Sequence, residues 1–270
     1  MSFSVKTISR PIVRQAISLM ESGVGFRTDP TGHLPNRIKM LAGRYEVFLV
    51  ESICRALPKD GVFADVGANV GYISRQVARR FRAARVLAFE PNPRIYPILE
   101  KNLGVYSNCQ SFNVGLGAKE GRLEFYHGAE SCVGSFMQEY TSTHPGNFHK
   151  GQIEKSQVRV APADAMLSQV TKIDVLKMDV EGYETEVLKG MSQLLAQGAV
   201  KTIFFEFCPF AQRFANCEPA EMIHLLSQRG YKVSEIEGES SGSVVNIENL
   251  SALLTRLGPN GYTTLRADAR

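Results

Sequence analysis

One segment restricts the fold of this chain more than any other: the turn Gly67–Gly71 (GANVG), which directly follows the apolar run Val62–Val66 (VFADV). A short apolar run of this kind is typical of a buried strand. Residues 71–82 then show helical periodicity, with apolar side chains on one predicted face and arginines, Arg75 among them, on the predicted solvent face. A strand, a glycine-containing turn and a helix in this order predict a nucleotide-binding α/β unit.

Short apolar runs alternate with helical periodicity along the rest of the chain. Further strands are expected at 85–89, 109–114, 122–126, 173–178, 202–207, 231–235 and 262–267. Helices are expected at 94–102, 187–195 and 218–229. This alternation predicts a Rossmann-like α/β fold, with a mostly parallel sheet and helices on both of its faces.

Two regions do not follow this pattern. Residues 1–43 lack a strand signal but have helical spacing over 8–21, so we expect a helical N-terminal extension before a main domain at 44–270. Residues 127–157 are rich in Gly, Ser, Thr, Asn and His and show little periodicity. We expect them to form a long, lid-like loop, because long loops inside compact domains are usually functional or disordered.

Composition excludes several classes of protein. The hydrophobic share of 44% and the charged share of 21% are ordinary for a soluble globular domain. No apolar run is long enough to span a bilayer and no signal segment is evident, so we expect a cytoplasmic protein. The five cysteines are scattered without a Cys-x-x-Cys pair, which argues against a disulfide framework or a thiolate zinc site. The sequence carries no signal for an oligomeric state.

The N-terminal 44 residues are basic, with seven Lys and Arg against two acidic residues. Such a segment can face an anionic substrate or a membrane surface, although a solvated basic face is the more common explanation. Aromatic residues are not interleaved with these charges, so we do not expect nucleic-acid binding.

The ends of the predicted strands carry the residues that can bind a ligand, because ligands of open α/β sheets bind beyond the carboxyl ends of the strands. Asp65 ends the first strand and can pair with a cation or order the turn. Gly67 lets the chain pass close to a ligand, and the next helix points free N–H groups at the pocket. Glu90 ends the second strand, and its carboxylate suits the two hydroxyls of a ribose.

Other residues of the same edge complete the expected cofactor site. Asn92 lies on the turn after Glu90 and can help to hold an adenosine, and Asn113 follows the third strand, where the edge of an adenine would lie. The residues expected to bind the cofactor are Asp65, Gly67, Ala68, Asn69, Gly71, Glu90, Asn92, Asn113 and Gly115.

The glycine pattern indicates which nucleotide binds. The dinucleotide fingerprint requires glycines where this chain has Asn69 and Tyr72, so a nucleotide-dependent oxidoreductase is a weaker alternative. A phosphate-binding loop of the Gly-x-x-x-x-Gly-Lys-Ser/Thr type is absent. A nucleoside without phosphates remains, and S-adenosylmethionine, with S-adenosylhomocysteine as its product, is the cofactor that we expect.

Three segments together carry a family resemblance. The segments 65–73 (DVGANVGYI), 89–93 (FEPNP) and 173–190 (IDVLKMDVEGYETEVLKG) resemble the FkbM family of S-adenosylmethionine-dependent methyltransferases. The stretch around Asp164 is also similar, although Ala163 stands where the family usually has Leu. The resemblance implies a class I methyltransferase fold with a seven-stranded sheet. It further implies O-methylation of a hydroxyl group on a sugar, a glycan or a natural product.

The acceptor side of the reaction depends on carboxylates. Methylation of an alcohol needs a nearby base, and the fourth long strand delivers Lys177, Asp179 and Glu181 at two-residue spacing. We rank Asp179 first as the base or orienting group and Glu181 second; helix-dipole stabilisation is an equally good explanation for Glu181 and the better one for Glu184. Glu206 lies inside an aromatic run, where a contact with substrate or metal and a structural pair with Lys177 or Arg213 are both open.

Three further questions stay open at this stage. His127, His144 and His149 flank or occupy the lid-like loop and could each act as a base, although loop histidines are more often solvated. The carboxylates Asp179, Glu181 and Glu206 could hold Mg²⁺, but carboxylates alone do not establish a metal, and we assign none. A non-catalytic protein that binds S-adenosylmethionine also remains an alternative.

Overall fold

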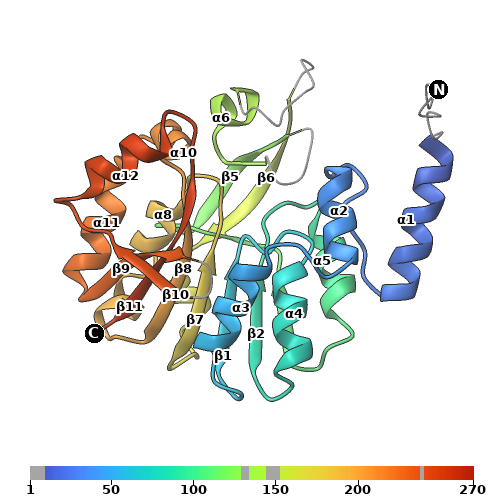
Figure 1. The fold of residues 1–270 in the computed structure, drawn as a ribbon, viewed down its shortest axis with the longest axis horizontal. Helices are drawn as coiled ribbons and strands as arrows, with labels where there is room; N and C mark the ends of the chain where they lie inside the picture. Colours follow the sequence, from blue (N-terminus) through green and yellow to red (C-terminus); the bar gives the residue numbers. More distant parts are fainter. Residues whose placement is uncertain (1–9, 129–133, 144–152, 238–239) are drawn as a thin grey trace, which may run out of the picture.

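The computed structural model describes residues 10–128, 134–143, 153–237 and 240–270. These residues form a main sheet of eight strands, helices on both of its faces and a smaller sheet of three strands (Figure 1). In the ranges that the structure describes, no helix has the length and apolar character needed to cross a membrane.

Parallel strands make up most of the main sheet. Its strands are β1 (Val62–Val66), β2 (Arg85–Phe89), β3 (Cys109–Phe112), β7 (Ile173–Met178), β8 (Val200–Phe207), β9 (Tyr231–Glu237), β10 (Ser240–Val244) and β11 (Thr263–Ala269). They lie in the order β10-β9-β11-β8-β7-β1-β2-β3. All neighbours from β8 to β3 are parallel, whereas β11 is antiparallel to both β8 and β9. The strands β1, β2, β3, β7, β8 and β9 therefore all end at one edge of the sheet.

The predicted α/β class and mostly parallel sheet are confirmed, but the predicted number of seven strands is wrong. The eighth strand is β10, which pairs antiparallel with β9 at the edge of the sheet. Its sequence SSGSV lacks the apolar alternation by which a strand is recognised. It becomes a strand because β9 offers it an unpaired edge, which is a property of the tertiary structure.

Two hydrophobic clusters fill the space between the sheet and its helices. On one face, Phe63 and Val175 pack against α1 (Arg10–Val24), α2 (Leu34–Leu41), α3 (Val47–Ala56) and α4 (Tyr72–Arg80). On the other face, Ala64 and Leu176 belong to a cluster that reaches α7 (Ala163–Met166), α8 (Glu184–Lys189), α9 (Ser192–Ala196), α11 (Pro219–Gln228) and α12 (Leu250–Leu257). Successive residues of each strand thus point to opposite layers.

The N-terminal helices α2 and α3 lie against the main domain on the side of α4 and α5 (Tyr96–Leu103), and α1 lies on the outer side of α2 (Figure 1). This packing corrects one expectation. Arg75, expected on a solvent face, is buried: its Nη2 donates to Val24 O at 2.7 Å, and its guanidinium lies 5.2 Å from the centre of the Phe26 ring. The segment after α1 covers this face of α4, which sequence periodicity cannot reveal.

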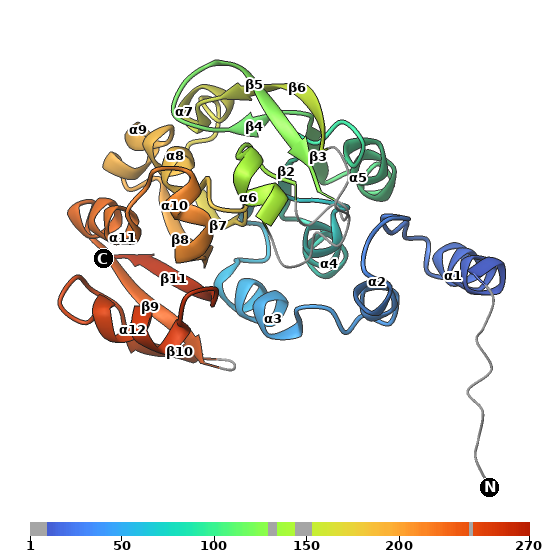
Figure 2. The ribbon, with the colours of Figure 1, turned by 90° about the horizontal axis from the view of Figure 1, so that it is seen from above.

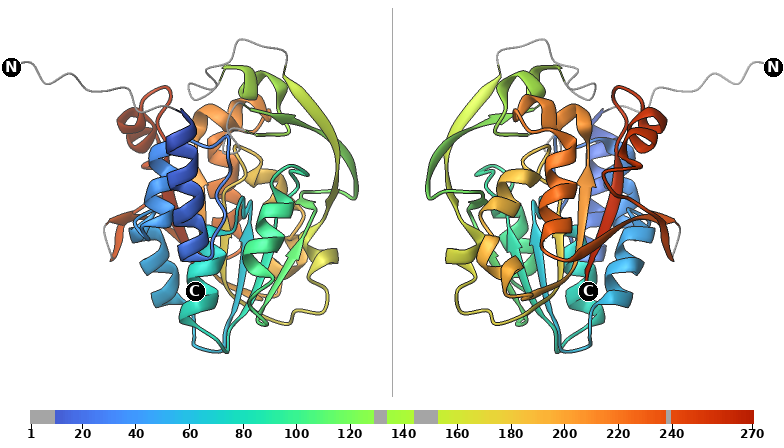
Figure 3. Two further views of the ribbon diagram at one scale, coloured as in Figure 1. Left: turned by 90° about the vertical axis from the view of Figure 1, so that its right-hand side faces the viewer. Right: turned by 90° about the vertical axis from the view of Figure 1, so that its left-hand side faces the viewer.

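The region expected to be a lid-like loop is more regular than its composition indicates. The strand β5 (Gly121–His127) pairs with β6 (Glu154–Ala161), and β6 pairs with β4 (Gly115–Leu116) to complete the small sheet, which curves along one side of the molecule (Figure 3). The helix α6 (Gln138–Thr143) lies between β5 and α10 (Pro209–Phe214) (Figure 2). The loop prediction is therefore wrong for 138–143 and 154–157, while 129–133 and 144–152 lie outside the described residues.

Candidate active site

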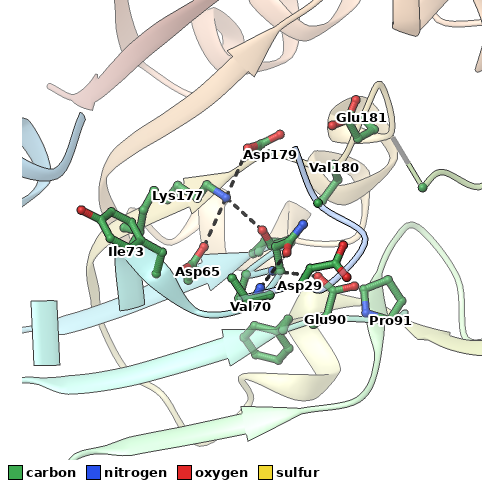
Figure 4. Close-up of a pocket in the computed structure, with 18 of the residues that line it drawn as sticks. Asp29, Asp65, Val70, Ile73, Glu90, Pro91, Lys177, Asp179, Val180 and Glu181 are labelled. Carbon is green, nitrogen blue, oxygen red and sulfur yellow. Dashed lines mark hydrogen bonds and ion pairs between the residues drawn. The ribbon is translucent and has the colours of Figure 1, made fainter. Parts of the chain in front are cut away.

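A buried lysine between two aspartates forms the centre of the site. Asp65 of β1 lies opposite Lys177 of β7, and Asp179 follows β7 directly. Lys177 Nζ donates to Gly67 O at 3.0 Å and lies 3.4 Å from Asp65 Oδ1 and 3.5 Å from Asp179 Oδ2 (Figure 4). Burial disfavours the ammonium ion, but the carboxylates of Asp179 and Asp65 outweigh it and raise the pKa of Lys177. Lys177 therefore stays charged and holds both aspartates at the strand ends.

The turn after β1 is shaped by the carboxyl group that ends β2. Glu90 Oε2 accepts the N–H of Asn69 at 2.8 Å, and Oε1 accepts the N–H of Asn92 at 2.8 Å. Asn69 has a φ of 50°, a left-handed conformation that asparagine tolerates better than most residues. Burial raises the pKa of Glu90 to about 7, although the two N–H groups oppose this rise. Glu90 thus both holds the turn and faces the space in front of it.

Gly67 allows the two strand ends to approach each other closely. It has a φ of 76°, and a Cβ at this position would lie 1.9 Å from Asp179 O. No other residue fits there, because the carbonyl of Asp179 is part of the backbone that follows β7.

In front of these residues lies a cavity of about 1180 Å³, a volume that includes the open space at its mouth (Figure 4). Most of the residues predicted to bind the cofactor line it: Asp65, Gly67, Ala68, Asn69, Glu90 and Gly115. Three of the residues predicted to be catalytic also line it: Lys177, Asp179 and Glu181.

Three residues predicted to contact the cofactor are not part of the cavity wall. Gly71 is the N-cap of α4. Asn92 Oδ1 accepts the N–H of Arg94, and Asn113 Nδ2 donates to Glu90 O at 2.9 Å. Both amides therefore stabilise the turn after β2, and the structure gives them a supporting position rather than a contact with the cavity.

Two side chains of the segment that contains α6 donate hydrogen bonds to Glu181. Tyr140 OH donates to Glu181 Oε2 at 2.5 Å, and Ser135 Oγ donates to Glu181 O at 3.3 Å. Burial and the nearby carboxylate of Asp179 raise the pKa of Glu181 well above its ordinary value. Glu184 is fully buried, and its Oε1 accepts the N–H of Val180 at 2.9 Å. Glu184 is therefore a structural residue that supports the loop carrying Glu181.

A second pocket of about 1230 Å³, open to solvent, adjoins the first. Glu206 of β8 lines it, and Glu46, Lys177 and Asp179 line both cavities. Burial and the carboxylates of Asp179 and Glu181 raise the pKa of Glu206 well above its ordinary value. Among the described residues, Glu206 forms no ion pair with Lys177 or with any arginine.

His127, one of the histidines considered as a base, does not lie at the site. His127 is buried in β5, its Nε2 lies 2.8 Å from Ser156 Oγ, and burial lowers its pKa to about 4. It lines neither cavity. His144 and His149 lie outside the described residues. Across the described ranges, no group of three or more His, Cys, Asp or Glu side chains is arranged to hold a metal ion.

Several residues of the cavity wall come from segments in which sequence analysis finds no functional motif. The N-terminal part of the wall consists of Asp29, Gly32, His33, Asn36, Arg37, Met40, Tyr45 and Glu46. Glu46 has a φ of 45°, so Glu46, Asn69 and Glu181 are three cavity-lining residues in a left-handed conformation. Such strained positions gather at functional sites. Only the basic character of residues 1–44 hinted at this contribution.

A family model described as the methyltransferase FkbM domain matches residues 65–233, well over half of the chain. The chain belongs to the FkbM methyltransferase family. The resemblance seen in the sequence is thereby confirmed. The match starts at Asp65 and contains Glu90, Lys177, Asp179 and Glu206, whereas the N-terminal part of the cavity wall lies outside it.

Three relatives place this FkbM methyltransferase among proteins of different lengths. AMB antimetabolite synthetase AmbE of Pseudomonas aeruginosa is 28% identical over 241 residues, which cover 76% of this chain but only 11% of AmbE. Hexuronic acid methyltransferase AglP of Haloferax volcanii is 29% identical, with 71% of each chain covered. The 2-O-methyltransferase NoeI of Sinorhizobium fredii is 24% identical, with 51% of this chain and 60% of NoeI covered.

The cofactor of an FkbM methyltransferase is S-adenosylmethionine. The residues that line the first cavity fit this cofactor. The buried carboxyl group of Glu90 can accept the hydroxyls of the ribose. Asp65 Oδ1 is buried and accepts no hydrogen bond from the described part of the chain, so it can face the cationic end of a ligand. Leu116, Phe125 and Phe136 supply the apolar surface that an adenine ring requires.

Proposed function

We propose that this FkbM methyltransferase methylates a hydroxyl group of an acceptor bound in the second pocket, with a sugar, a glycan or a polyhydroxylated natural product as the acceptor. The observation that carries the proposal is the junction of the two cavities, which share Glu46, Lys177 and Asp179. Holding two reactants in one geometry contributes several orders of magnitude to a rate, and adjoining cavities are the structural requirement for it.

Asp179 is the base in this proposal. When bound, S-adenosylmethionine supplies an electrophilic methyl group. The side chain of Asp179 is 36% exposed and lines both cavities, so it can accept the proton of an acceptor hydroxyl. Lys177 lies 3.5 Å from Asp179 Oδ2 and keeps this carboxylate directed at the junction.

Glu206 and Glu181 have supporting roles in the proposal. Glu206 is positioned to accept hydrogen bonds from an acceptor, and Tyr262, Thr263 and Thr264 add polar groups to the same pocket. Glu181, which Tyr140 holds in place, is the second choice for the base.

The names of two relatives support a carbohydrate-like acceptor. One relative is called a hexuronic acid methyltransferase and another a 2-O-methyltransferase. The lining of the second pocket is mostly apolar, but Glu206, Tyr262, Thr263 and Thr264 give it polar groups that can bind the hydroxyl groups of an acceptor.

A panel of acceptors with methyl-labelled S-adenosylmethionine tests the proposal. The panel contains neutral methyl glycosides, hexuronic acids, polyols, primary amines and catechols, and each product is analysed for the atom that carries the label. We expect label on oxygen, and only with acceptors that bear hydroxyl groups. Label found on nitrogen or carbon, with none on oxygen, would contradict the proposal.

A further inference from the structure

The two cationic side chains that line the cofactor cavity differ in how they are surrounded by groups of the protein. Arg37 and Lys177 are the two lysine or arginine side chains among its described lining residues. The ammonium group of Lys177 donates to Gly67 O and lies within 3.5 Å of the carboxylates of Asp65 and Asp179. Its charge is therefore already balanced by two carboxylates of the protein.

Arg37 is fixed in position but keeps unused donors. Its Nε donates to Thr28 Oγ1 at 2.8 Å, its Nη1 to Pro30 O at 3.3 Å, and its Nη2 lies 3.5 Å from Glu21 Oε1. A guanidinium has five N–H donors in a planar fork. These contacts account for three of them, so one N–H on each terminal nitrogen remains.

The segment that carries Arg37 is tied to the cofactor-binding turn. Asn102 of α5 accepts the N–H of Arg27 at 2.7 Å, and its Nδ2 donates to Arg27 O at 2.8 Å and to Val70 O at 2.7 Å. One side chain thus connects the N-terminal segment with the turn after β1. The N-terminal wall is held in a defined position relative to the rest of the cavity.

The charges of the cofactor make this arrangement specific. The amino-acid part of S-adenosylmethionine carries one ammonium and one carboxylate. The cavity offers several carboxyl groups to the ammonium, Asp29 and Asp65 among them. For the carboxylate, Arg37 offers one free N–H on each terminal nitrogen, and arginine binds carboxylates through two parallel hydrogen bonds.

We propose that Arg37 binds the carboxylate of the cofactor's amino-acid part, which makes the N-terminal segment outside the matched family domain a component of the cofactor site. The competing donors are the free backbone N–H groups at the start of α4. In this proposal, one of the basic residues of the N-terminal segment has a function, because Arg37 binds the cofactor.

Calorimetry with two ligands tests the proposal. S-adenosylhomocysteine contains the amino-acid part, whereas 5′-methylthioadenosine lacks it. We expect Arg37→Gln to weaken the binding of S-adenosylhomocysteine about tenfold or more and to change that of 5′-methylthioadenosine less than about twofold. The matched control is Lys39→Gln, which removes the same charge from an exposed position of α2 outside the cavity wall and leaves both affinities unchanged.

Each other outcome overturns the proposal. An equal loss for both ligands would mean that Arg37 only supports the wall, and no loss would mean that backbone N–H groups bind the carboxylate. A comparison that needs no variant protects against poor folding of Arg37→Gln: the wild-type protein should bind S-adenosylmethionine about tenfold more tightly than its decarboxylated analogue, and equal affinities contradict the assignment. The proposal rests on the cofactor alone, so it stands even if the acceptor panel fails.

Discussion

The two cavities that meet at Asp179 differ in how their carboxyl groups are partnered. In the cofactor cavity, Asp65 faces the ammonium group of Lys177, and Glu90 accepts two backbone N–H groups. These contacts exist within the protein itself. The cofactor cavity is therefore organised before anything binds, which lowers the entropic cost of binding.

The second pocket has a carboxyl group, that of Glu206, without such a partner. Glu206 forms no ion pair in the described part of the chain, and burial together with Asp179 and Glu181 raises its pKa well above the ordinary value. The difference teaches that one cavity is built to hold a fixed ligand, while the other leaves hydrogen-bonding groups to be satisfied by an acceptor.

The largest effect is expected from Asp179→Asn, which removes the base at the junction. Turnover should fall about 10²- to 10⁴-fold, because a general base contributes on that scale. The affinity for S-adenosylhomocysteine should change less than about threefold. Initial rates with an acceptor from the panel, together with calorimetry, check both values.

Glu206→Gln is the matched variant on the acceptor side. It should raise the KM for the acceptor while kcat changes less than in Asp179→Asn, because Glu206 lines only the second pocket. If Glu206→Gln lowers kcat as much as Asp179→Asn does, the two carboxyl groups do not have the different roles that we propose.

The next effect tests whether the cofactor cavity is organised by its own ion pair. Lys177→Met leaves Asp65 buried without its cation, so the free energy of unfolding should fall by about 3 kcal/mol. Urea denaturation measures this loss, with Lys39→Met as the exposed control. The double variant Asp65→Asn/Lys177→Met should recover part of the loss, and a single-variant loss below about 1 kcal/mol would show that the pair is not structural.

A smaller effect concerns the protonation of Glu90, whose pKa is raised to about 7 by burial. Hydroxyl groups bind more strongly to a carboxylate than to a neutral carboxyl group. The affinity for S-adenosylhomocysteine should therefore rise with pH up to about pH 7, by no more than about tenfold per pH unit, and level off above it. Calorimetry at several pH values checks this, and an equally steep slope in Glu90→Gln would assign the dependence to another group.

The smallest effect is expected from Tyr140→Phe, which removes the hydrogen bond to Glu181 Oε2. The free energy of unfolding should fall by about 1 kcal/mol, since one buried acceptor loses its donor. Tyr262→Phe is the control, because Tyr262 is 66% exposed. Equal stability of the two variants would mean that the Tyr140 hydroxyl does not support Glu181.

The cofactor side could be predicted from the sequence because its signals are local. Asp65 lies next to the last residue of β1, Glu90 directly follows β2, and Gly67 stands in the turn, while the strand ends meet at one edge of a parallel sheet. Local signals were not sufficient to predict the roles of Asn92 and Asn113. Side chains near a turn can stabilise the turn itself, and both asparagines do so here.

The other parts could not be predicted because they depend on segments that are far apart in the sequence. The strand β10 needs the edge of β9, and the burial of Arg75 needs the segment after α1. Arg37 and Glu46 reach the cavities only because the N-terminal helices pack beside α4. Periodicity and spacing describe a segment by itself, so contacts of this kind leave no trace in them.

A crystal structure of the protein with S-adenosylhomocysteine tests the central claim most directly. We expect the ribose at Glu90, the carboxylate of the amino-acid part at Arg37, and the sulfur atom directed at Asp179 and the mouth of the second pocket. A ligand whose sulfur points away from Asp179, or one that occupies the second pocket instead, would contradict the account.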